Sequence, residues 1–281
     1  MKTWMTVGGV LVVFAAVVRV GLPKLLAGIG FHRHYDIPPM DLRGRHALIV
    51  ATSHDVLGGT GKPTGVFASE MTVPYYAFSD AGMTVDVASI KGGPIPIDRM
   101  SLRWPLKSGA DERFLSDAIF QSRVQQSLAI DSLDMDHYDI VFLAGGWGAA
   151  YDFGTSSELG EKMSDAYANE AVVGGVCHGP LGLMNATAPD GSPLVQGRRV
   201  SAVTDKQIRE LGITHTPMHP ERELRAAGVV FEAEGRFRDL FASRVVTDGR
   251  IVTGQNQNSG AEAAHKMMEA LLAAESATPR P

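Results

Sequence analysis

The sequence predicts an α/β protein with a doubly wound, mostly parallel sheet. Two observations support this fold class: short apolar runs rich in β-branched residues, and helical segments that alternate with them along the chain. The composition agrees, because 44% hydrophobic and 20% charged residues are typical of a globular protein. A chain of 281 residues is long enough for one large domain.

Each predicted element has a local justification. The strands are apolar or alternating runs, predicted at 46–51, 84–88, 139–144, 172–176, 199–203, 229–233, 245–247 and 251–253. A helix is predicted over 65–82, interrupted near Pro74 and ended by Gly82. An inserted helical stretch follows at 101–133, where apolar residues recur at helical spacing. The remaining predicted helices are 159–169, 221–227 and 261–274.

The chain divides into three predicted parts: a hydrophobic segment and linker at 1–40, a catalytic domain at 41–275 and a tail at 276–281. Within the first part, residues 3–18 are uncharged, which predicts an N-terminal hydrophobic helix, although a membrane span needs about 20 apolar residues. We expect a membrane anchor, and the basic residues after it place the domain in the cytoplasm. The alternatives are a cleaved export signal, or a misassigned start with Met40 opening a soluble cytoplasmic protein.

Charge and cysteine content exclude several classes. The net charge is −5, and the first 35 residues carry +4, so the remaining 246 carry −9. An acidic body argues against nucleic-acid binding, which needs a basic face. The single cysteine, Cys177, excludes a disulfide framework within the chain and a cysteine-based zinc cluster. This cysteine is either an inert core residue or a reactive thiol.

The surroundings of Cys177 favour a reactive thiol. The predicted strand 172–176 ends at Cys177, and Pro180 stands where a helix begins. Such a strand-to-helix turn is a nucleophile elbow, which exposes one side chain at the carboxyl edge of the sheet. A helix N-terminus and a neighbouring imidazole both lower a thiol pKa, so we expect Cys177 to be partly thiolate and ready to attack an electrophilic carbon.

Several motifs occur in an order that resembles one known family. They are Thr64 to Glu70 with Pro74-Tyr75-Tyr76, Ser89 to Asp98, Tyr138 to Gly148, Cys177-His178-Gly179-Pro180, and Asp248 to Asn256. Together they resemble the ThiJ/PfpI superfamily, which is class I glutamine amidotransferase-like and flavodoxin-like in fold. The resemblance covers about residues 45–272 and is closest to the branch of heat-shock chaperones and glyoxalase III enzymes.

The resemblance implies roles for individual residues. Cys177 would be the nucleophile, Glu70 would move protons beside the thiol, and His178 would be the imidazole partner. An acid orients the histidine in this branch. Counting along the family pattern from Gly197 lands on Ile208, which cannot serve, so we favour Asp205, with Glu210 as the alternative. The implied oxyanion and pocket residues are Gly145, Gly146, Trp147 and Gly179.

The implied function is a glyoxalase III-like lyase that uses no cofactor and converts methylglyoxal or similar α-oxoaldehydes to 2-hydroxy acids through a hemithioacetal on Cys177. The resemblance also implies repair of glycated proteins and chaperone activity as related functions. Because members of the family commonly form dimers, it implies a homodimer as well. One residue departs from the family pattern, since Trp147 stands where a histidine is common. A cysteine-dependent amidase or peptidase, and a non-catalytic holdase or redox sensor, therefore remain as alternatives.

Other clusters are interpreted as structural. His215 and His219 have the spacing of metal ligands on a helix, but Pro217 and Pro220 prevent a regular helix there, and we predict no metal site. His32 and His34 belong to a basic segment, and we expect them to bind no metal.

Overall fold

The computed structural model describes residues 18–19, 21–22, 24–31 and 33–277. Its centre is a seven-stranded sheet in the order β3-β2-β1-β4-β5-β9-β8, and all neighbouring strands are parallel except β9 and β8. The strands of this sheet are β1 His46–Ala51, β2 Thr84–Ser89, β3 Leu128–Ala129, β4 Ile140–Leu143, β5 Val172–Val176, β8 Val245–Asp248 and β9 Ile251–Gly254. A separate pair is formed by β6 Arg199–Val200 and β7 Val230–Phe231. The predicted α/β class is confirmed.

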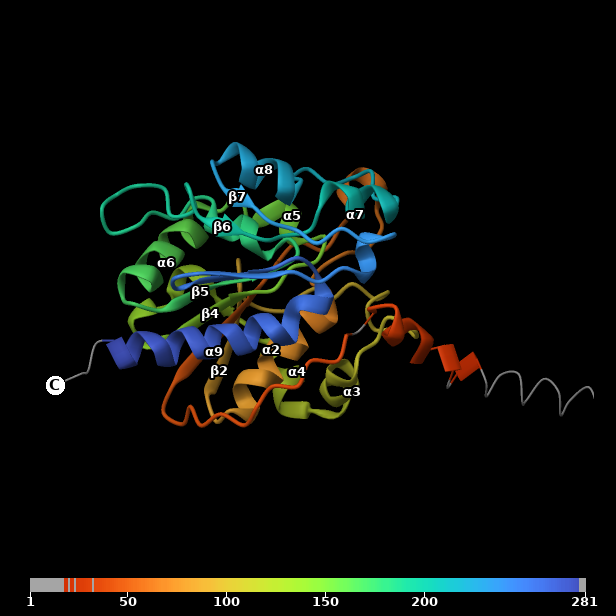
Figure 1. Ribbon diagram of the computed structural model, residues 1–281, viewed down its shortest axis with the longest axis horizontal. Coiled ribbons are helices and arrows are strands. Elements are labelled where there is room, and N and C mark those ends of the chain that lie inside the picture. Colours follow the sequence, from red (N-terminus) through yellow and green to blue (C-terminus); the bar gives the residue numbers. More distant parts are fainter. Residues whose placement is uncertain (1–17, 20, 23, 32, 278–281) are drawn as a thin grey trace, which may run out of the picture.

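Helices cover both faces of the sheet (Figure 1). The α-helices are α2 Ala68–Asp80, α3 Gly109–Ser116, α4 Ala118–Gln125, α5 Ala149–Asp152, α6 Ser157–Ala168, α7 Asp205–Glu210, α8 Pro220–Ala226 and α9 Gly260–Ala277. Alternate residues of β1 point to opposite faces, so Ala47 and Ile49 join the core under α2 and α9, while Leu48 and Val50 join the core under α6. This two-sided burial explains why the strands are continuously apolar.

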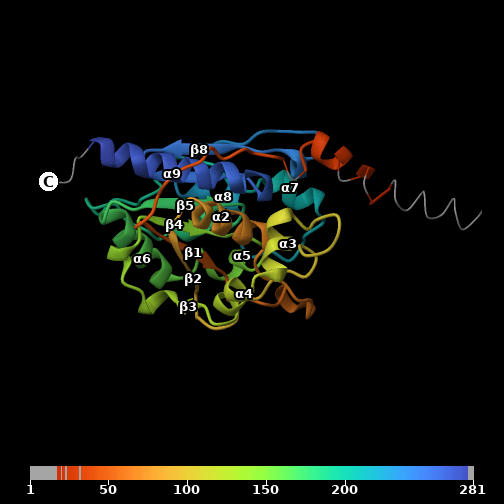
Figure 2. The ribbon, with the colours of Figure 1, turned by 90° about the horizontal axis from the view of Figure 1, so that it is seen from below.

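The structure corrects the predicted break at Pro74, because α2 runs through this proline. A proline inside a helix costs about 3 kcal/mol, since one backbone hydrogen bond is lost. Met71 and Phe78, on either side of Pro74, are fully buried, and α2 packs along α9 (Figure 2). Packing of the buried side chains therefore outweighs the local cost.

The predicted helical stretch at 101–133 is shorter and divided. Asp117 has extended backbone angles that end α3, and its side chain accepts hydrogen bonds from the first turn of α4. The strand β3 follows inside the same stretch and pairs with only two residues of β2, Ala88 and Ser89. A strand of two residues is too short to show an alternating pattern in the sequence.

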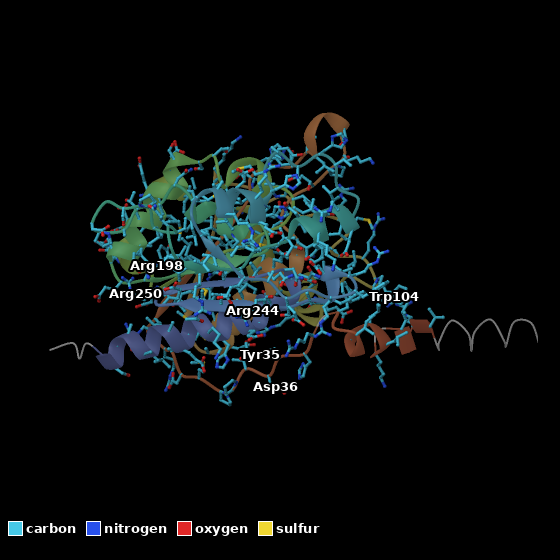
Figure 3. All side chains as sticks on the ribbon, turned by 45° about the horizontal axis from the view of Figure 1, so that its top comes forward. Tyr35, Asp36, Trp104, Arg198, Arg244 and Arg250 are labelled. Carbon is cyan, nitrogen blue, oxygen red and sulfur yellow. The ribbon has the colours of Figure 1, made fainter. Side chains whose placement is uncertain are left out.

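The segment before β1 lies against the domain. Phe31 is buried and packs edge-on against Phe241, with ring centroids 6.2 Å apart. Tyr35 lies beside α9, where its hydroxyl group is 2.8 Å from Nδ1 of His265 (Figure 3). These contacts hold Phe31 and Tyr35 against the folded body of the protein.

The predicted membrane anchoring is wrong for the part of the chain that the structure describes. Among the described residues, no helix has both the length and the apolar character needed to cross a bilayer. Most of the predicted hydrophobic helix, residues 3–17, lies outside the described residues.

Candidate active site

Cys177 occupies a strained turn directly after β5. Its backbone φ is 61°, in the left-handed region that residues other than glycine rarely adopt. The strain is held by backbone hydrogen bonds, because the N–H of Cys177 donates to Gly254 and its carbonyl accepts from Val203. The chain then enters the short 3-10 helix η4, Gly179–Leu183. This geometry fits the predicted nucleophile elbow, although the following helix is a 3-10 helix.

The imidazole of His178 lies directly beside the thiol. Nδ1 of His178 is 3.3 Å from Sγ of Cys177, and the histidine is only 1% exposed. The ring of Trp147 packs edge-on against His178, with centroids 4.8 Å apart. Trp147 is half-buried against the core, so it forms a wall beside the histidine.

The carboxyl group of Glu70 reaches the thiol from α2. Glu70 lies in the first turn of α2 and is 1% exposed. Its carboxyl group interacts with the Cys177 thiol and with the N–H of Gly145, although Oε2 makes no hydrogen bond of ordinary geometry to any described residue. A Cβ atom at position 145 would lie 2.4 Å from this Oε2, so only glycine leaves room for the carboxyl group.

Backbone donors complete the surroundings of the sulfur. The N–H groups of Gly146 and His178 are directed at Sγ of Cys177. Gly146 has a φ of 112°, which glycine adopts without strain. Gly179 is buried at the start of η4, where a Cβ atom would lie 2.1 Å from the carbonyl oxygen of Leu143. The structure thus places Gly145 and Gly146 beside the carboxyl group and the thiol, whereas Gly179 packs against Leu143.

Burial controls the protonation of all three side chains. It raises the pKa of Glu70 to about 8, so this carboxyl group is protonated at neutral pH. Burial and the nearby His219 lower the pKa of His178 to about 3, so its imidazole is neutral. Burial raises the pKa of the Cys177 thiol, and a charged Glu70 adds to this effect.

The raised thiol pKa corrects the prediction of a partly ionised cysteine. The N–H groups of Gly146 and His178 do lower the pKa, as the sequence suggested, but the loss of solvent outweighs them. The resting site holds a thiol, a neutral imidazole and a protonated carboxyl group. If Cys177 acts as a nucleophile, its thiol proton has to leave as the sulfur attacks.

The structure does not bring either predicted acid to His178. Asp205 begins α7, and its Oδ1 is 3.1 Å from Nδ1 of His219. Glu210 ends α7 and accepts a hydrogen bond from the backbone N–H of Asp239. Nε2 of His178 is buried and has no hydrogen-bond partner among the described residues.

Reasoning from the sequence missed His219 as a neighbour of the active-site histidine. Its spacing from His215 points only to the question of a metal site. Among the described residues, no group of three or more His, Cys, Asp or Glu side chains is arranged to hold a metal ion. A possible signal was the pair His219-Pro220, because proline at the first helical position places His219 at the N-terminus of α8.

A separate cavity of about 540 Å³ lies at the other edge of the sheet. Its lining includes Arg45, Asp139 and Ala171, which precede β1, β4 and β5. The chain's single cysteine lies at the carboxyl end of β5, away from this cavity. Ligands of open parallel sheets bind at the carboxyl edge, so the site around Cys177 is the stronger candidate.

We expect Glu70→Gln to remove a pH-dependent loss of stability. The pKa of Glu70 rises from 4.5 to about 8 on folding, so between these values the folded state holds a proton that the unfolded state releases. The free energy of unfolding then falls as pH rises, by about 1.4 kcal/mol per pH unit for one proton. Glutamine does not titrate, so the variant should gain about 2–4 kcal/mol relative to the native protein between pH 5 and pH 8.

Urea unfolding at the two pH values measures this difference. Glu161→Gln, on the exposed side of α6, is the matched control and should show no such gain. Equal pH dependence of the native protein and the Glu70→Gln variant would contradict a buried carboxyl group with a raised pKa.

The fold and site together define a class: an α/β protein with a cysteine at a strained turn, between a carboxyl group and an imidazole. The chain belongs to the DJ-1/PfpI family, whose sequence pattern matches residues 63–270. The resemblance inferred from the motifs is thereby confirmed.

Individual relatives cover most of the chain. The chain is 29% identical over 238 residues to a Saccharomyces cerevisiae protein named glutathione-independent glyoxalase HSP31, covering 81% of this chain and 98% of the relative. A solved structure of rapid encystment protein from Francisella tularensis has a TM-score of 0.74 at 30% identity, covering 81% of this chain and 99% of the other. Glyoxalase III from Candida albicans has a TM-score of 0.69 at 27% identity, covering 80% and 97%.

Proposed function

We propose that this protein is a glyoxalase III-like enzyme, which converts small α-oxoaldehydes such as methylglyoxal to 2-hydroxy acids without glutathione or another cofactor. The observation that carries the proposal is the buried contact of Cys177 with both Glu70 and His178. Relatives named glutathione-independent glyoxalase and glyoxalase 3 support it.

The proposed reaction begins with addition of the thiol to the aldehyde carbon. Sγ of Cys177 forms a bond to this carbon, the thiol proton passes to Nδ1 of His178, and the carbonyl electron pair moves onto oxygen. The proton of Glu70 neutralises that oxygen, and the product is a hemithioacetal. The N–H groups of Gly146 and His178 stabilise the oxyanion as it develops.

Glu70 then carries the central proton transfer. Its carboxylate removes the hydrogen of the former aldehyde carbon while the neighbouring ketone oxygen takes the proton held by His178, giving an enediol. Glu70 then returns the proton to the neighbouring carbon, and the hydroxyl group of the first carbon gives its proton back to His178. This isomerisation turns the hemithioacetal into a thioester on Cys177. Water cleaves the thioester, which releases the 2-hydroxy acid and restores the thiol. A carboxyl group with a pKa of about 8 suits both steps, because it is close to balance between its acid and base forms.

Lactate formation from methylglyoxal tests the proposal. We expect the purified full-length protein to make lactate with no glutathione present. A set of activated amides assayed in parallel separates the lyase from the cysteine-dependent amidase or peptidase. Turnover of the amides without lactate formation would contradict the proposed reaction.

Domain limits and assembly are part of the same proposal. We propose 41–275 as the catalytic domain, after the segment 1–40 and before the tail 276–281, and the family match at 63–270 lies within it. We propose a homodimer from the family resemblance, which light scattering would detect as twice the mass of the chain.

A further inference from the structure

The buried side of His178 lacks the partner that a catalytic imidazole normally has. Nδ1 faces the thiol, so in the neutral tautomer that accepts the thiol proton, Nε2 carries the other hydrogen. Nε2 is buried and makes no hydrogen bond to a described residue. An unsatisfied buried donor costs about 1–3 kcal/mol, so an acceptor is expected on this side.

The positions that the sequence suggested as partners of His178 do not supply this acceptor. Ile208, at the position reached by counting along the family pattern, is 1% exposed and apolar. Asp205 pairs with His219, and its backbone N–H donates to Glu221. Among the described residues, therefore, no carboxylate accepts a hydrogen bond from Nε2 of His178.

Two packing contacts bring His219 to the neighbourhood of His178. His219 is the N-cap residue of α8, and α8 packs against η4, which directly follows His178. The side chain of Met218 contacts Gly154, where an added Cβ atom would lie 2.6 Å from Met218 and 3.7 Å from Leu181 of η4. Met218 and His219 thus lie close to η4.

The loop before His219 is fixed at a second point. The hydroxyl group of Tyr151, on α5, donates to the backbone carbonyl of His215. Because α5 follows the turn that carries Trp147, this bond ties the loop to the wall of the active site. The loop that ends at His219 is therefore attached at two points, through His215 to Tyr151 and through His219 to Asp205.

We propose that His219, held by Asp205, takes the place of the missing acid and positions His178, through a bridging water, for the proposed glyoxalase reaction. Asp205 accepts the Nδ1 hydrogen of His219, which leaves the Nε2 lone pair of His219 to accept from the water. The water in turn accepts the Nε2 hydrogen of His178. This inference rests on the proposed function for its role in turnover but not for its effect on the thiol.

The protons balance along this path. When Sγ attacks the aldehyde, its proton moves to Nδ1 of His178, and the imidazole becomes a cation. The pair of His219 and Asp205 stabilises that cation without itself losing or gaining electrons. When the thioester is cleaved, His178 returns its proton to the leaving sulfur. His219 and Asp205 are positioning residues here, because neither contacts the reacting atoms.

The test compares His219→Ala and Asp205→Asn in the full-length protein with a matched control, His215→Ala. His215 is an exposed histidine four residues before His219, and only its backbone carbonyl bonds to Tyr151. The first readout is the rate at which iodoacetamide alkylates Cys177, which mass spectrometry follows cleanly because the chain has one cysteine. The second is methylglyoxal turnover, separated into kcat and KM.

We expect both variants to lower the alkylation rate and kcat about tenfold to a hundredfold, with little change in KM. Added imidazole should restore the His219→Ala variant, which it would not do for a merely structural defect. The variant that carries both His219→Ala and Asp205→Asn should be alkylated no more slowly than His219→Ala alone, because the two residues act as a unit. His215→Ala should match the native protein.

The inference is overturned if His219→Ala and Asp205→Asn stay within twofold of His215→Ala. Should His219→Ala not fold, His219→Phe decides: it keeps a planar ring but can hydrogen-bond neither Asp205 nor the water, so a native alkylation rate overturns the inference. Reduced alkylation in a protein that never turns over methylglyoxal would contradict the proposed function and support the inference.

Discussion

Cys177→Ala is expected to abolish lactate formation from methylglyoxal, with a loss of at least about a thousandfold in kcat. The proposed reaction passes through two covalent states on this sulfur, and the chain has no second cysteine to replace it. Alanine is smaller than cysteine and apolar, and the site is buried, so the fold should persist. The measurement is the initial rate of lactate formation, with circular dichroism to confirm folding.

Cys177→Ser tests whether the reaction needs the nucleophilic thiol or only a side chain of this shape at position 177. Serine keeps a hydroxyl group beside Glu70 and His178, but this group is a far weaker nucleophile, so the variant should also be inactive. A folded Cys177→Ala protein that makes lactate at the native rate would exclude the covalent mechanism. Retained suppression of protein aggregation in the same variant would instead favour a holdase role.

Glu70→Gln is expected to lower kcat by about a hundredfold to ten-thousandfold, because the amide cannot carry the proton between the two carbons. The variant keeps the size of the side chain and the contact with Gly145, so KM should change little. Steady-state kinetics with methylglyoxal at neutral pH measures both constants.

The pH profile gives a second signature of Glu70. Its pKa of about 8 means that the protonated form, which donates to the carbonyl oxygen, is present below pH 8 and is lost above it. Activity of the native protein should therefore fall as pH rises through about 8. The Glu70→Gln variant should lack this descending limb, and an identical limb in both proteins would assign the titration to another group.

The strands β1 and β5, and the helix around Pro74, show where local sequence patterns predict secondary structure correctly and where they do not. The bounds of β1 and β5 agree with the predicted strands at 46–51 and 172–176, because each is a continuous apolar run ended by a turn. Pro74 shows the opposite case, since α2 continues through it under the packing of α9. Local propensity predicts an element well only where tertiary packing does not oppose it.

The sequence by itself determined the fold class, the position of Cys177 after a buried strand, and the family to which the chain belongs. Only the tertiary structure decided that Asp205 pairs with His219 and leaves Nε2 of His178 without a partner. Burial of Cys177, which raises the pKa of its thiol, is likewise a property of the tertiary structure. The physical reason is that strands follow from neighbouring residues, whereas pKa values and side-chain partners depend on burial and on residues brought together from distant parts of the chain.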